Sequence, residues 1–118
     1  MEITTEFKSR ADDIVAMFLD TFTASEGREA GELIKELVAD MLFSLTSEDM
    51  HVFSAVENGK VLASIIFTRM TFPVDDRTVF ILAPVAVSTG HQGKGLGQRL
   101  IRHALDVLRK EGVDVALT

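Results

Sequence analysis

A run of closely spaced glycines is the part of this chain best suited to chemistry. It reads Gln92-Gly93-Lys94-Gly95-Leu96-Gly97 and stands between a strongly apolar run and an amphipathic pattern. Glycine lets the backbone turn sharply and approach a ligand closely, and the free N–H groups at the start of a helix attract anions. The pattern therefore predicts a phosphate-binding loop, in which a pyrophosphate group would fit well.

Two common phosphate-binding motifs do not match this loop. GxxxxGK[ST] fails because Gly95 follows Lys94 where a hydroxyl side chain is needed, and GxGxxG fails because Gln98 replaces the last glycine. The pattern that remains is [RQ]-x-x-G-x-[GA]. Such a loop is sometimes only a tight connection, and Lys94, Arg99 and Arg102 could either neutralise phosphate or lie solvated on a helix face.

The elements beside the loop are a buried strand and a helix. Val79 to Val87 is apolar on both faces, which is typical of a central strand, and Pro84 predicts a bulge or splayed pairing there. The apolar stripe from Leu96 to Leu108 predicts a helix with Gly112 as its C-cap. Val113 to Leu117 is then the last strand. It is expected to run parallel to the strand that ends at Val87, because a crossover helix joins the two.

The first half of the chain predicts a strand, two helices and a hairpin. Glu2 to Phe7 alternates like a strand, Ser9-Arg10-Ala11-Asp12 resembles a capping box, and Ser25-Glu26-Gly27 separates two helical patterns. Asn58-Gly59 suits a type I′ turn between two strands, and Asp75-Asp76-Arg77 predicts a second turn. The expected order is β-α-α-β-β-β-α-β. The residues expected on one face of each helix are Ile14, Met17, Phe18 and Phe22, and Leu33, Ile34, Leu37, Val38, Met41, Leu42 and Leu45.

Composition narrows the class of protein. The 118 residues fit one globular domain, residues 1–118, and the absence of Cys excludes disulfides, thiolate metal sites and a cysteine nucleophile. No secretory signal or membrane span is found, so we expect a cytoplasmic protein. A net charge of −6 argues against a nucleic acid partner. Residues 1–60 hold 13 acidic and 5 basic side chains and residues 61–118 hold 5 and 7, so an anion site is expected in the second half.

The run Ala83-Pro84-Val85-Ala86-Val87, the loop and the element order together resemble the GNAT superfamily of N-acetyltransferases, in particular its small bacterial members. The resemblance implies a mixed, mostly antiparallel sheet flanked by helices, and acetyl-CoA as the co-substrate. It also implies direct attack of a primary amine on the acetyl thioester. The backbone of Val85, Ala86 and Val87 would face the thioester and the pantetheine arm, with the Val85 amide stabilising the oxyanion. The amides that would hold the pyrophosphate are those of Gln92, Gly93, Lys94, Gly95, Leu96, Gly97 and Gln98.

The chain departs from this family in two respects. Some branches carry a glutamate base where Phe80-Ile81-Leu82 stands here, and the weak candidate that remains is Glu57, beside a turn where carboxylates are usually solvated. Members of the family commonly continue past the last strand with a helix and two more strands, which supply a tyrosine that protonates the leaving thiolate. The 118 residues of this sequence contain no Tyr. The resemblance therefore implies a domain that is truncated at the C-terminus. In this superfamily the stretch corresponding to Ala24 to Glu29 borders the acceptor site.

Two alternatives stay open from the sequence. One is a non-catalytic acyl-CoA-binding or regulatory module of the same fold. The other is an interaction domain in which the open sheet edge after Val113 to Leu117 pairs with a second copy to give a homodimer. His91 could contact the coenzyme or simply flank the loop, whereas His51 and His103 match a strand start and a helix surface. No pair has metal-ligand spacing, so no metal site is expected.

Overall fold

The computed structural model describes residues 1–45, 48–72 and 75–117. The element order is β-α-α-β-β-β-α-β, as the sequence predicts, with two short 3-10 helices added. The elements are β1 (Glu2–Thr4), η1 (Lys8–Arg10), α1 (Ala11–Glu26), α2 (Arg28–Ser44), β2 (Met50–Glu57), β3 (Lys60–Phe72), β4 (Asp75–Val87), η2 (Thr89–His91), α3 (Leu96–Lys110) and β5 (Val115–Leu117).

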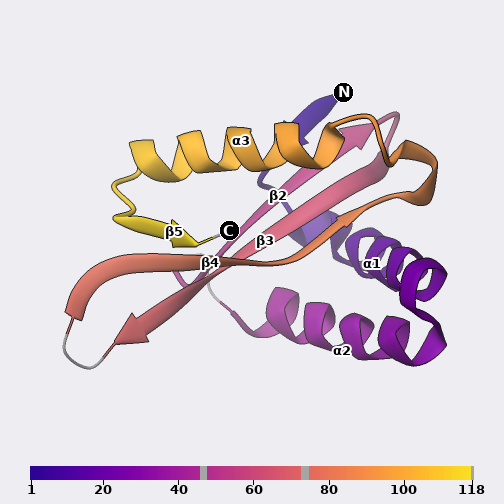
Figure 1. Cartoon of the computed structure of the whole chain (residues 1–118), viewed down its shortest axis with the longest axis horizontal. Helices are drawn as coiled ribbons and strands as arrows, with labels where there is room; N and C mark the ends of the chain where they lie inside the picture. Colours follow the sequence, from indigo (N-terminus) through magenta and orange to yellow (C-terminus); the bar gives the residue numbers. More distant parts are fainter. Residues whose placement is uncertain (46–47, 73–74, 118) are drawn as a thin grey trace.

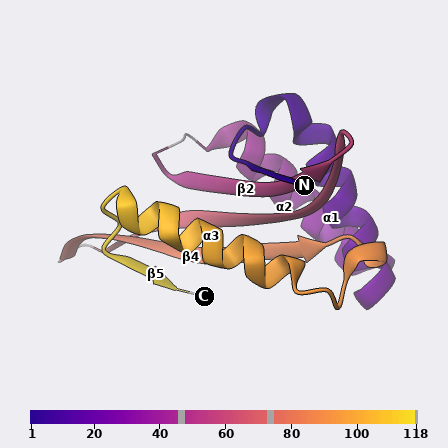
Figure 2. The same cartoon turned by 90° about the horizontal axis from the view of Figure 1, so that it is seen from above.

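The five strands form one sheet in the order β1-β2-β3-β4-β5. The first four are antiparallel neighbours, and β5 runs parallel to β4 beside Val79 to Ile81. Helices α1 and α2 cover one face and α3 covers the other (Figures 1 and 2). This is the mixed, mostly antiparallel sheet flanked by helices that the sequence predicts.

Two apolar layers hold the helices to the sheet. Alternate residues of a strand point to opposite faces, so Val52 and Ile66 pack with α1 and α2, while Phe53, Ile65 and Phe67 pack with α3. The side chains of all five are almost fully buried. Both faces of β2 and β3 are therefore core, which explains why these strands read as continuous apolar runs.

The start of α1 corrects one prediction. The prediction of a capping box at Ser9 is wrong. The 3-10 helix η1 precedes α1, and the N-cap of α1 is Arg10, which makes no side-chain cap hydrogen bond. Ser9 instead donates its backbone N–H and its hydroxyl to the carboxylate of Glu6. These hydrogen bonds from Ser9 lower the pKa of Glu6. The Glu6 carboxylate thus takes the Ser9 N–H, which the side chain at the third helical position would accept in a capping box.

The two helices meet closely at a glycine. Gly27 has φ +97° and separates α1 from α2, as predicted. A Cβ on Gly31 would lie 2.0 Å from Thr23 Oγ1 and 3.2 Å from the Leu19 carbonyl oxygen, so α2 approaches α1 where it has no side chain. The apolar stripe expected on α2 is only partly covered, since Leu33 is 69% and Leu37 is 49% exposed.

The hairpins confirm one turn and correct another. Asn58 and Gly59 have φ of +52° and +78°, as a type I′ turn requires, and they join β2 to β3. The turn predicted at residues 75–77 is wrong, because Asp75 already pairs with Phe72 and belongs to β4. Ladder pairing with β3 outweighs the turn preference of these polar residues. The connection falls at residues 73–74, outside the described residues.

The bulge at Pro84 is confirmed. Ile65 pairs with Val85 and Phe67 with Leu82, so β4 contains one more residue than β3 across this interval. At the end of α3 the C-cap is Glu111 rather than Gly112, which follows it at φ +86°. None of the described helices is long and apolar enough to cross a membrane.

Candidate functional site

The outer edge of β4 presents free backbone groups next to the glycine-rich loop. The N–H of Ser88 bonds to the carbonyl oxygen of Leu62 on β3 at 2.8 Å. Bonded and non-bonded pairs alternate along an antiparallel ladder, so the backbone N–H and C=O groups of Val85 and Val87 point away from β3. Strand β5 pairs with β4 only as far as Ile81. Among the described residues, no strand covers the edge beyond it.

The side chains of the same stretch fix the strand in place. Ala86 is buried against the layer of α1 and α2, while Val85 and Val87 pack against the layer under α3. The three residues predicted to line the site therefore use their side chains for the core. What they offer to a ligand at the edge is main chain, as the resemblance implies.

A side-chain hydrogen bond joins the loop to the end of this strand. Gln92 donates its Nε2 to the carbonyl oxygen of Val87 at 2.9 Å. The 3-10 helix η2 lies between them, with the His91 N–H bonded to the Ser88 carbonyl oxygen at 2.8 Å. Nδ1 of His91 is buried without a hydrogen-bond partner among the described residues. The contact of Gln92 was not predicted, because the motif specifies the residue but not its partner.

Two loop glycines adopt a left-handed backbone conformation. Gly93 has φ +79° and Gly95 has φ +74°, and no atom lies within 4 Å of a Cβ built on either residue. Their requirement for glycine is therefore conformational, and the space beside them is open. Gly97 differs, because its Cβ would lie 3.2 Å from Val87 Cγ2. Because Gly97 has no side chain, the first turn of α3 packs directly against β4.

The first turn of α3 has free backbone N–H groups and no acidic side chain to neutralise them. Gly95 is the N-cap and makes no side-chain cap, and the first intrahelical bond runs from the Arg99 N–H to the Gly95 carbonyl oxygen at 3.0 Å. The N–H groups of Leu96, Gly97 and Gln98 consequently have no acceptor within the helix. No acidic residue stands in this turn, and Lys94 is exposed beside it. The helix dipole and these N–H groups favour a phosphate here.

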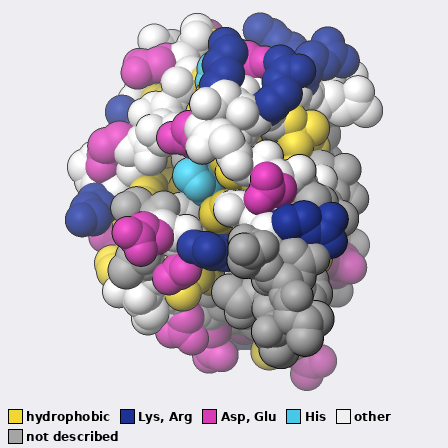
Figure 3. Space-filling model, turned by 90° about the vertical axis from the view of Figure 1, so that its left-hand side faces the viewer, with side chains coloured by type: hydrophobic (Ala, Val, Ile, Leu, Met, Phe, Trp, Pro, Cys, Tyr) yellow, Lys and Arg dark blue, Asp and Glu magenta, His cyan; other side chains and the backbone are white. Residues whose placement is uncertain are grey.

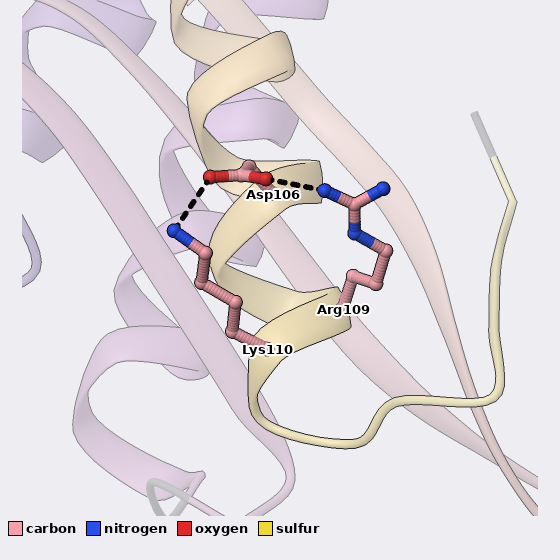
Figure 4. Close-up of polar contacts among 3 residues, drawn as sticks. All are labelled: Asp106, Arg109 and Lys110. Carbon is pink, nitrogen blue, oxygen red and sulfur yellow. Dashed lines mark hydrogen bonds and ion pairs between the residues drawn. The ribbon is translucent and has the colours of Figure 1, made fainter.

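The last turn of the same helix has its own charge pairs. Asp106 contacts Arg109 at 2.7 Å and Lys110 at 3.2 Å (Figure 4). The hydrogen bond and charge of Lys110, followed by those of Arg109, lower the pKa of Asp106. The cations at this end of α3 are thus engaged locally, away from the glycine-rich loop.

The candidate base Glu57 lies on the surface at the end of β2. Its carboxylate is 51% exposed and stands 3.7 Å from the N-terminal ammonium. This is the setting of an ordinary surface carboxylate. Across the described residues, no group of three or more His, Asp or Glu side chains could hold a metal ion.

A cavity of about 320 Å³ lies between α1 and the start of the loop. Asp13 and Asp20 line it from α1, Lys60 from β3, and Ser88 and Thr89 from the segment that follows β4. It combines two carboxylates with hydroxyl groups next to the proposed phosphate site. The stretch 24–29, which the resemblance assigns to the acceptor site, does not line this cavity.

Comparisons with known proteins agree with the resemblance. Residues 11–118 match the profile of the acetyltransferase (GNAT) family. The uncharacterized N-acetyltransferase YjhQ of Escherichia coli strain K12 is 39% identical over 79 residues, which cover 65% of this chain and 44% of that protein. The match therefore spans less than half the length of this curated relative.

Solved structures show the same fold. A possible acetyltransferase from Clostridium difficile 630 superposes with a TM-score of 0.77 at 19% identity, covering 98% of this chain and 76% of that one. A GNAT family acetyltransferase from Brucella melitensis, solved in complex with acetyl-CoA, superposes with a TM-score of 0.76 at 26% identity. The match covers 98% of this chain and 72% of that one.

Proposed function

Because the chain belongs to the GNAT acetyltransferase family, we propose that it transfers an acetyl group from acetyl-CoA to a primary amine. One observation carries this proposal. Free main-chain groups at the β4 edge and free N–H groups at the start of α3 meet at a loop whose glycines leave open space. Such an arrangement suits a ligand with an extended amide arm and a pyrophosphate.

Each part of the site has a role in this proposal. The N–H groups of Leu96, Gly97 and Gln98 bind the pyrophosphate, with Lys94 adding positive charge. The Val87 N–H pairs with the amide arm, while the Val87 carbonyl oxygen keeps its hydrogen bond from Gln92. The Val85 N–H donates to the thioester oxygen, which gains negative charge as the amine attacks, and losing such a donor typically costs about 3–4 kcal/mol in the barrier. The neutral amine nitrogen bonds to the acetyl carbon, the carbon–sulfur bond breaks, the nitrogen loses one proton and the leaving thiolate gains one.

The acceptor is proposed to be a cationic amine. Asp13 and Asp20 stand seven residues apart on α1, about 10 Å along the helix axis, and both line the cavity beside the loop. Two carboxylates at this spacing suit an amine with more than one positive charge. Lys60 also lines this cavity, so its charge is not uniformly acidic.

A second function is favoured by the absence of an evident acid and base. The residues Phe80, Ile81 and Leu82 are apolar, and the sequence contains no Tyr. A chain with the coenzyme site but without proton-transfer groups would bind acyl-CoA without turnover. We therefore retain a non-catalytic acyl-CoA-binding module as the alternative.

Calorimetric titration with acetyl-CoA tests the proposed site. Gly95→Asp should abolish saturable binding, because it places a carboxylate in the open space beside the α3 N-terminus. Gly112→Asp is the matched control, since Gly112 has a similar φ of +86°, equally open space, and lies at the other end of α3. Absence of binding by the folded wild-type chain would refute the proposal.

Thiol release distinguishes the two functions. The chain has no Cys, so any thiol formed with acetyl-CoA and an amine comes from the coenzyme. Spermidine, an aminoglycoside, a free amino acid and a peptide with a free N-terminus serve as acceptors. Thiol release that requires the amine supports the transferase, whereas binding without release supports the non-catalytic module.

A further inference from the structure

A second cavity lies at the other end of the sheet from the glycine-rich loop. It has a volume of about 420 Å³ and lies between the segment after β1, the start of β2 and the end of α3. Met50, at the start of β2, pairs with Thr68 of β3, which pairs with Ile81 of β4. Ile81 precedes Val87 by six residues, so the cavity and the β4 edge at Val87 are separated by about 20 Å along the strand. The residues that matter are Phe7, Met50, His51, Phe53, Val107 and Glu111, and we call this space the His51 cavity.

Apolar side chains form most of the walls. Met50 and Phe53 are almost completely buried behind this lining, so the apolar surface that a ligand can reach comes from Phe7 and Val107, which are only partly buried. The imidazole of His51 stands edge-on to Phe80, with ring centroids 4.8 Å apart, so its orientation is fixed by packing. A volume of this size is within the usual range for small-molecule sites.

Two polar groups converge on this apolar space. His51 Nδ1 and Glu111 Oε2 are 4.0 Å apart, which is too far for a direct hydrogen bond. Burial lowers the pKa of His51, and the charge of Glu111 offsets this only in part, so the environment favours the neutral ring. A neutral imidazole and a carboxylate at this separation both offer hydrogen-bond acceptors to one donor group between them.

The carboxylate of Glu111 is not neutralised by a neighbouring cation. Its side chain is 55% exposed and forms no ion pair with Lys or Arg among the described residues. The nearest cations on its helix, Arg109 and Lys110, are both held by Asp106 (Figure 4). No Lys or Arg lines the cavity in the part of the chain that the structure describes.

The surface at this end of the molecule carries both acidic and basic side chains. Figure 3 views the end toward which the C-terminus of α3 points. Lys and Arg side chains are most frequent along the upper rim, and a histidine surface lower down has both acidic and basic side chains around it.

We propose that the His51 cavity binds a small primary amine with an aromatic or branched apolar group. The ammonium lies between Glu111 and His51, and the apolar group packs on the partly exposed side chains of Phe7 and Val107. A nitrogen about 2.8 Å from both acceptors fits their 4.0 Å separation with an angle of about 90° at the nitrogen, near enough to tetrahedral for two of its three N–H groups to donate. This site is separate from the proposed coenzyme site and goes beyond the proposed acetyl transfer.

Two matched probes test the proposal without any variant. 2-Phenylethylamine and 2-phenylethanol have similar shapes and differ in charge at pH 7.5. We expect the amine to bind at least tenfold more tightly, with saturable amide shifts in NMR spectra at Phe7 and Val107. The His51 ring should also become harder to protonate when the amine is bound, because a positive charge then stands beside it. Equal binding of the two probes, or no saturable shift at these residues, overturns the proposal.

A variant pair then tests the role of the carboxylate. Glu111→Gln keeps the side-chain shape at an exposed position and should remove the tenfold preference for the amine. Glu36→Gln, on the exposed face of α2, removes the same charge elsewhere and should keep it. A preference that survives in Glu111→Gln, with the fold verified by circular dichroism, also overturns the proposal.

Discussion

Replacing Gly95 by alanine should destabilise the folded chain, whereas the same replacement at Gly90 should not. Gly95 has φ +74°, while φ of Gly90 lies outside the left-handed region. No atom lies within 4 Å of a Cβ at either position, so steric clashes do not distinguish the two variants. Both belong to one loop segment and lose the same backbone freedom in the unfolded state. Only the folded-state conformation differs.

The magnitude follows from that difference. A left-handed backbone costs an L-residue about 1–2 kcal/mol. The reduced entropy of the unfolded chain stabilises each alanine variant by about 0.4–1 kcal/mol, and this contribution cancels when the two variants are compared. Gly95→Ala should therefore be about 1–2 kcal/mol less stable than Gly90→Ala. Gly95→Asn should fall between them, because asparagine tolerates this conformation better than alanine.

Urea unfolding followed by far-UV circular dichroism measures these stabilities, since the chain has no Trp or Tyr to serve as a fluorescent probe. The m-values should agree among the variants. If Gly95→Ala and Gly90→Ala have equal midpoints, Gly95 does not adopt the left-handed conformation. The account of the loop, and of the helix N-terminus that it positions, would then be refuted.

Three further predictions concern packing, pH and the loop. Gly31→Ala should lower the free energy of unfolding by about 1–2 kcal/mol, because overpacking against Thr23 outweighs the gain in helix propensity, and adding Thr23→Ala should restore part of it in urea titrations. His51 has a lowered pKa when folded, so the unfolded state binds its proton more readily. Stability should therefore fall as the pH drops below about 6.5, the ordinary pKa of histidine, and His51→Gln should flatten this dependence in melts from pH 5 to 8. Gln92→Leu should weaken acetyl-CoA binding two- to fivefold in calorimetry, because the loop loses about 0.5–1 kcal/mol from its hydrogen bond to Val87.

Each of these has an outcome that contradicts it. A Gly31→Ala variant as stable as the wild type would mean that the helices do not approach as closely as described. An unchanged pH profile in His51→Gln would assign the acid sensitivity to other groups. Unchanged coenzyme affinity in Gln92→Leu would show that the loop does not depend on its bond to the strand.

Local patterns predicted most of the fold. The positive-φ pair Asn58-Gly59, the proline bulge in β4 and the break at Gly27 all depend on backbone preferences of single residues, and these are visible in a sequence. The parallel pairing of β4 with β5 follows from the helix that joins them. Such features need no knowledge of distant contacts.

The errors arise where two local preferences compete. Ser9 could cap α1 or bond to Glu6, and the carboxylate three residues earlier takes both donors. Asp75 could start a turn or continue a strand, and pairing with Phe72 decides for the strand. Periodicity also failed to indicate that Leu33 and Leu37 stay exposed, because an apolar stripe does not reveal what covers it.

The sequence indicated which type of loop forms the candidate site, but it did not indicate which contacts the residues of the loop make. The glycine spacing predicted the loop, yet it could not indicate that Gly97 serves packing against Val87 while Gly93 and Gly95 serve conformation. His51 and Glu111 are sixty residues apart, and only the folded sheet brings them to one cavity. No spacing rule in the sequence would have joined them.

Amide chemical shifts measured while acetyl-CoA is added test the central claim most directly. If the coenzyme binds at the β4 edge and the start of α3, the N–H resonances of Val85, Val87, Leu96, Gly97 and Gln98 should move together and saturate at one dissociation constant. The resonances of β1 and of the last turn of α3 should stay in place. Saturable shifts confined to other elements, or none in the folded chain, would contradict the assignment of this loop as the coenzyme site.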